Sequence, residues 1–105
     1  MDPASLAPLV RGLALSRSGP APQARAVVAA KAMAPSSLPA AAFKATIGDT
    51  APGAEAGLAS ALAAALPAGT GLPFLLAAVS GGEAWLFAAA RSLDEAQSLL
   101  EAPAA

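Results

Sequence analysis

The fold of this chain is decided by its residues 72–90, which read LPFLLAAVSGGEAWLFAAA. Two apolar runs, residues 72–79 and 84–90, flank a glycine-containing connection at 80–83. A Gly-Gly pair supplies the two positions of positive φ that a tight two-residue hairpin turn needs. The pattern therefore predicts an antiparallel β-hairpin with the two glycines in its loop.

The register of this hairpin determines which side chains share a face, because successive side chains of a strand point to opposite faces. With both glycines in the loop, Ala78 lies opposite Trp85, and Leu76 lies opposite Phe87. One face then collects the larger side chains and the other a lighter set, and neither face is polar. The two sets are Phe74, Leu76, Trp85 and Phe87 on the first face, and Leu75, Val79 and Leu86 on the second.

Three segments outside the hairpin have patterns typical of helices. The first has apolar residues at helical spacing over 6–13, and the second has a leucine at every fourth position over 58–66. The third follows the hairpin, where Ser92 precedes Glu95 by the three residues of a capping box. We expect a helix in each of these segments.

Residues 24–47 fit two interpretations. As strands, segments 25–33 and 41–47 flank a turn-rich loop with two prolines, and the second segment alternates apolar and polar side chains. As helices, the same segments would have Pro22 and Pro39 at first-turn positions, and Gly48 would end the second helix. We favour the strands, and the helical interpretation stays open at this point.

The order of elements predicts an α+β domain. A leading helix is followed by two ββα-like units, which form a small antiparallel sheet with helices packed on one face. If residues 24–47 are helical, the chain is instead mostly helical with one C-terminal hairpin. We expect one domain over residues 1–101, followed by a frayed tail at 102–105.

The composition favours association with another protein. Charged residues make up 12% of the chain and hydrophobic residues 56%, and so few charges cover a monomer's surface poorly. A hairpin that is apolar on both faces needs cover on both, and three short helices suffice for one. We therefore expect another copy of the chain, or a different protein, to cover the lighter face. The expected interface residues are Leu75, Val79 and Leu86, with Trp85 and Phe87 as further candidates that fit the core better.

The sequence contains little catalytic or metal-binding chemistry. Histidine and cysteine are absent, which excludes Ser-His-Asp triads, thiol catalysis and disulfides. Asp94 and Glu95 fit a helix start better than an acid–base pair, and carboxylates alone rarely build zinc sites. The loop at 67–73 lacks the lysine and the spacing of a phosphate-binding loop. We expect no enzyme activity, no catalytic residue, no cofactor and no metal.

Nucleic acids and membranes are weaker candidates than proteins as partners. Five basic residues are scattered over residues 1–48, which makes a poor phosphate-binding surface. Residues 56–82 contain no charge, so a membrane-associated protein that uses this stretch is the alternative. Prolines and glycines over 67–73 interrupt it, however, and leave backbone groups unpaired. The N-terminus lacks a basic signal-peptide region. The sequence thus predicts a cytoplasmic, non-enzymatic interaction or assembly subunit.

Overall fold

A computed structural model of the protein describes residues 3–17, 26–47, 55–67 and 69–101. These residues form three α-helices and a four-stranded sheet, which confirms the predicted α+β class. The ambiguous segment 24–47 contains strands, as the favoured interpretation predicts. The frayed tail predicted at 102–105 lies outside the described residues. The elements are α1 (Pro3–Arg17), β1 (Val27–Met33), the 3-10 helix η1 (Pro35–Ser37), β2 (Phe43–Thr46), α2 (Glu55–Ala65), β3 (Phe74–Ser80), β4 (Glu83–Ala90) and α3 (Leu93–Glu101).

The hairpin β3–β4 has the predicted register. Ser80 pairs with Glu83, Ala78 with Trp85, and the alignment continues to the start of β3. The turn differs from the expectation in one respect, since Gly81 alone of the two loop glycines has a positive φ, of 59°. Positive φ at the first loop position is the pattern of a type II′ turn, which suits the twist of a hairpin equally well.

The sheet is mixed rather than antiparallel throughout, which corrects the predicted pairing. Its strand order is β1-β4-β3-β2. β4 is antiparallel to both of its neighbours, whereas β2 and β3 are parallel. The reason is the connection: α2 lies between β2 and β3 in the chain. A helical crossover returns the chain to the end at which it began, so the next strand runs in the same direction.

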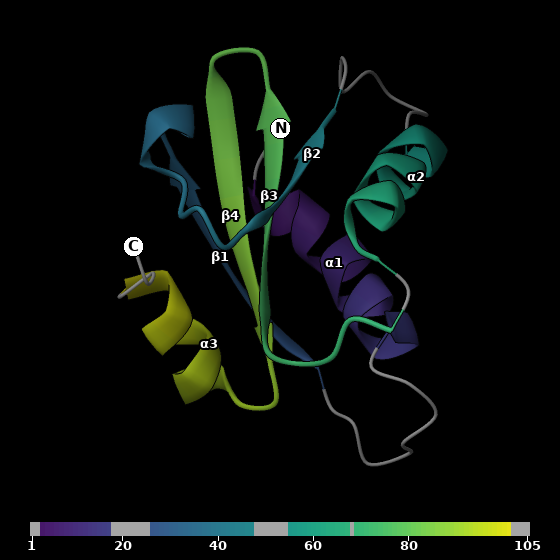
Figure 1. The fold of residues 1–105 in the computed structure, drawn as a ribbon, viewed down its shortest axis with the longest axis vertical. Coiled ribbons are helices and arrows are strands. Elements are labelled where there is room, and N and C mark those ends of the chain that lie inside the picture. The colour runs from purple at the N-terminus through teal and green to yellow at the C-terminus, as the bar shows by residue number, and fades with distance from the viewer. Residues whose placement is uncertain (1–2, 18–25, 48–54, 68, 102–105) are drawn as a thin grey trace.

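The heavier face of the hairpin is covered by α1 and α2 (Figure 1). Leucines 58, 62 and 66 of the α2 region point into this core and are buried. The uncharged stretch, residues 56–82, spans most of α2, the connection to β3, β3 itself and the two glycines of the hairpin turn. No helix in the described part of the chain combines the length and hydrophobicity that crossing a bilayer requires. The buried strand residues of this core are Ala45, Phe74, Leu76, Ala78, Trp85, Phe87 and Ala89.

The lighter face is covered by α3 and by the connection from β1 to β2, so helices pack on both faces and not on one as predicted. α3 packs on β1 and β4, with Ala96 and Leu100 buried against the sheet. Because β1 and β2 form opposite edges, residues 34–42 must cross the sheet to join them (Figure 1). Ala42 is buried in the same cluster as Leu75 and Leu86, which places the crossing on this face. Helix α3 and residues 34–42 thus cover the lighter face together.

Candidate interaction surface

The residues predicted to form an interface on the lighter face are mostly buried within the chain. Leu86 is 0% exposed and Leu75 is 7% exposed, and Val79 is half-buried. The expectation that a second protein covers this face assumed that the chain's own helices leave it open, and that assumption is wrong. The reason is that α1 and α2 pack on one face of the sheet, whereas α3 packs on the other.

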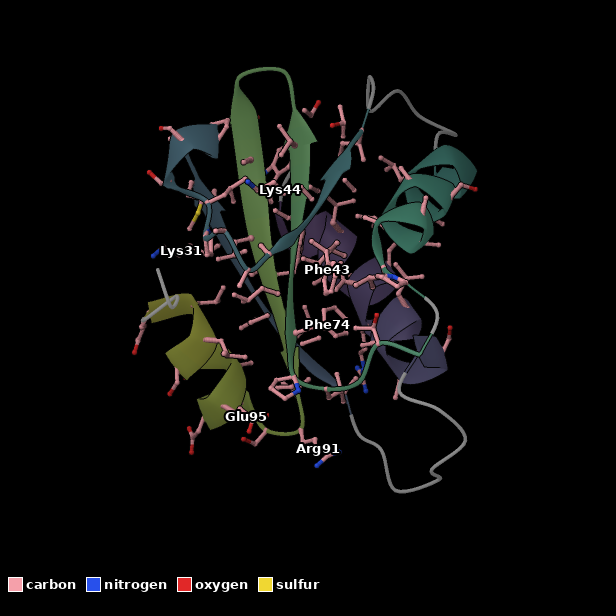
Figure 2. All side chains as sticks on the ribbon, in the orientation of Figure 1. Lys31, Phe43, Lys44, Phe74, Arg91 and Glu95 are labelled. Carbon is pink, nitrogen blue, oxygen red and sulfur yellow. The ribbon has the colours of Figure 1, made fainter. Side chains whose placement is uncertain are left out.

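Trp85 and Phe87 belong to the other side of the sheet, in the core beneath α1 and α2. Their exposed fractions are 3% and 0%. The structure therefore brings Leu75 and Leu86 together in one cluster and places the two aromatic residues in the other. Phe43 of β2 packs against the aromatic cluster, and it points to the same side as Phe74 (Figure 2).

The longer open edge among the described strands is the outer side of β1. This strand has seven residues and pairs with β4 along its inner side. Within the described ranges, no strand lies along its outer side. An edge strand carries a row of backbone N–H and C=O groups that are ready to pair with another strand. The other edge, β2, offers a much shorter row of four residues.

Two of the three exposed side chains of β1 are alanines. Ala30, Lys31 and Ala32 are exposed, and the remaining four residues of the strand are half-buried. Lys31 projects outward at this side of the sheet (Figure 2). Such a strand presents its backbone without bulky obstruction, and it carries a positive charge close to its centre.

A groove lies beside the first half of β1, between this strand and α1. It has a volume of about 640 Å³. Leu15, which is 43% exposed, contributes an apolar side chain, and Arg11 is the charged residue in the lining. The remaining lining residues are small or apolar: Ala7, Pro8, Gly12, Ala26, Val27 and Val28.

The charges near this edge have opposite signs on the strand and on α3. Lys31 has no ion pair among the described residues. It is in register with Leu86, so it lies on the face that α3 covers. α3 itself carries no basic residue, and its acidic residues Asp94, Glu95 and Glu101 are all exposed.

Glu95, in the first turn of α3, has the capping role that the sequence predicts. The backbone N–H of Glu95 donates to Ser92 Oγ at 3.1 Å. The Glu95 carboxylate in turn accepts from the backbone N–H of Arg91 at 3.5 Å. Among the residues that the structure describes, no buried side chain is polar or charged, and no three acidic residues gather as a metal site would need.

Comparisons of the chain with protein-family models, with curated proteins and with solved structures found no match. The candidate surface therefore rests on the geometry of the chain itself.

The sequence pattern predicts a strand over 25–33 but does not mark the outer edge of that strand as a surface. The signal that could have done so is Lys31, which interrupts an otherwise apolar strand. Lysine in a strand is typical of edges, where its charge meets solvent. Arg11 and Leu15 come from a different element, so no spacing in the sequence links them to β1.

Proposed function

We propose that this chain is a small, non-enzymatic interaction subunit that joins another protein chain through the outer edge of β1. The observation that carries the proposal is the open seven-residue edge of β1 beside the α1 groove. Strand addition at such an edge supplies affinity through main-chain hydrogen bonds and specificity through neighbouring pockets.

The two parts of this surface have complementary roles in the proposal. Among the described residues, no strand pairs with the main-chain groups on the outer side of β1, which favours an extended partner segment. The groove supplies an apolar site at one end, where Leu15 and Val28 can contact a side chain of the added strand. Lys31 favours a partner that brings acidic groups to the α3 side of this edge.

Site-specific photo-crosslinking in the native cell tests this proposal. A benzophenone amino acid replaces Ala32, which is exposed on β1. The matched control carries the same label at Ser60, an exposed position on α2, since α2 packs beside β2 at the opposite edge of the sheet. We expect a discrete adduct from position 32 after irradiation and much less from position 60.

Mass spectrometry of the adduct then identifies what occupies the edge, whether another copy of this chain or a different protein. Either identity supports an interaction subunit that works through β1. Absence of a discrete adduct at position 32, or equal yields at positions 32 and 60, contradicts the proposal.

A further inference from the structure

We infer that the occupant of the β1 edge is a second copy of the chain, which pairs antiparallel with β1 about a twofold axis at Ala30. This inference rests on the proposed function and names its partner. The two sheets then join into one continuous sheet through their β1 strands. An interface of this kind is isologous, because the same surface serves both subunits.

Full overlap of the two strands determines the register. The strand covers residues 27–33, so pairing all of it antiparallel places Ala30 opposite Ala30 of the partner subunit. Lys31 then lies opposite Ala29 of the partner subunit, and the two lysines do not oppose each other directly. Like charges placed directly opposite would destabilise the pair. The remaining cross-strand pairs join Val28 to Ala32 and Val27 to Met33, all of them apolar.

The twofold axis also determines which helices meet. Directly opposed residues of an antiparallel pair lie on the same face, so both subunits present the same faces to the same sides. The α1 helices then flank the seam on one side of the joined sheet, and the α3 helices flank it on the other. The small residues Ala7 and Gly12 line the groove beside the seam and leave room for close approach.

Charge complementarity supports a second copy as the occupant of this edge. Lys31 lies on the face that α3 covers and has no ion pair within the described residues. In the paired arrangement this lysine lies between the α3 helices of the two subunits. Each α3 carries exposed acidic residues and no basic one. One chain therefore supplies both the cation and the acidic surface, and the twofold axis brings them together twice.

Disulfide trapping tests this register directly, because the chain has no cysteine of its own. In the Ala30→Cys variant of the purified full chain, the two thiols face each other across the axis. In the matched control, Ala32→Cys, the thiols are about four residues out of register, roughly 14 Å apart along the strands. A disulfide needs Cα atoms within about 7 Å, so the control cannot form the bond within the dimer.

Under mild oxidation we expect Ala30→Cys to double the chain mass of 10.0 kDa, with at least a tenfold lower yield from Ala32→Cys. Multi-angle light scattering of the unmodified protein should give the dimer mass at high concentration. Lys31→Glu should weaken the dimer about tenfold, as expected for reversal of a charge at an interface rim. Its circular dichroism spectrum should be unchanged.

Equal cross-linking of the two cysteine variants, or a monomer at every concentration, overturns the inference. If light scattering gives a monomer and position 32 cross-links to a different protein, only the inference that the occupant is a second copy is overturned. In that outcome the proposed interaction function would stand. Loss of both the dimer and the position-32 adduct would overturn both proposals, so the two failures are distinguishable.

Discussion

Large side chains are scarce in this protein, and the buried interior is assembled mostly from alanine and leucine. Burial of one CH₂ group stabilises by about 0.8 kcal/mol, so each buried leucine contributes far more than an alanine. Leu86 is the clearest case on the lighter face. It has no exposed surface and lies in one cluster with Leu75 and Leu100.

At the scale of the residue, we predict that Leu86→Ala lowers the free energy of unfolding by about 2–5 kcal/mol. The reason is the cavity left between the sheet and α3, which small neighbours cannot refill. Urea denaturation monitored by circular dichroism measures the change. The control is Leu93→Ala, since Leu93 is 52% exposed and its truncation should cost less than about 0.5 kcal/mol. Equal effects of the two substitutions would contradict the packing of α3 on this face.

At the scale of the element, α3 is short, and its stability depends in part on the hydrogen bonds at its N-terminus. A helix of nine residues is marginal in isolation, and most of its stability comes from packing of an apolar face. Ala96 and Leu100 supply that face, and the Ser92 hydroxyl satisfies one of the otherwise unpaired N–H groups at the first turn. The cap therefore supports the element that covers the lighter face.

We predict that Ser92→Ala destabilises the protein by about 1 kcal/mol, the usual cost of a lost N-cap. Thermal unfolding measures the shift. Ser98→Ala is the matched control, because Ser98 is exposed in the body of the same helix and alanine is the better helix former there. A loss from Ser98→Ala as large as that from Ser92→Ala would show that the capping bond contributes nothing specific.

At the scale of the whole molecule, the two faces of one sheet are covered by different means (Figure 1). α1 and α2 pack on the heavier face, whereas α3 and the crossing chain at 34–42 cover the lighter one. The central strands β3 and β4 are thereby covered on both faces, and among the described residues no strand pairs with the outer sides of β1 and β2. The proposed contact at β1 therefore involves an edge of the sheet and leaves the covered faces unchanged.

We predict that amide hydrogen exchange is slowest in β3 and β4, because these central strands are paired on both sides. If the β1 edge pairs with a second copy, exchange in β1 should slow further as protein concentration rises. The same measurement on β2, the shorter edge, supplies the control and should show no such dependence. Mass spectrometry of proteolytic fragments at two concentrations provides both readings. Concentration dependence in β2 rather than β1 would contradict the assignment of the edge.

Local pattern alone determined the hairpin, its register and the start of α3. In each case the deciding residues are neighbours in the chain: Gly-Gly sets the turn, alternation sets the faces, and Ser92 with Glu95 sets the cap. These interactions span a few residues, so short-range chemistry suffices to specify them.

The tertiary structure decided the parallel pairing of β2 with β3, the placement of α3 and the open edge of β1. Each of these depends on residues far apart in the chain. The alternation around Phe43 is the same for a parallel or an antiparallel neighbour, and a strand's own side chains barely distinguish an edge from a centre. Which face α3 covers depends on how much of the sheet α1 and α2 have already covered, and that competition is settled only when the whole chain packs.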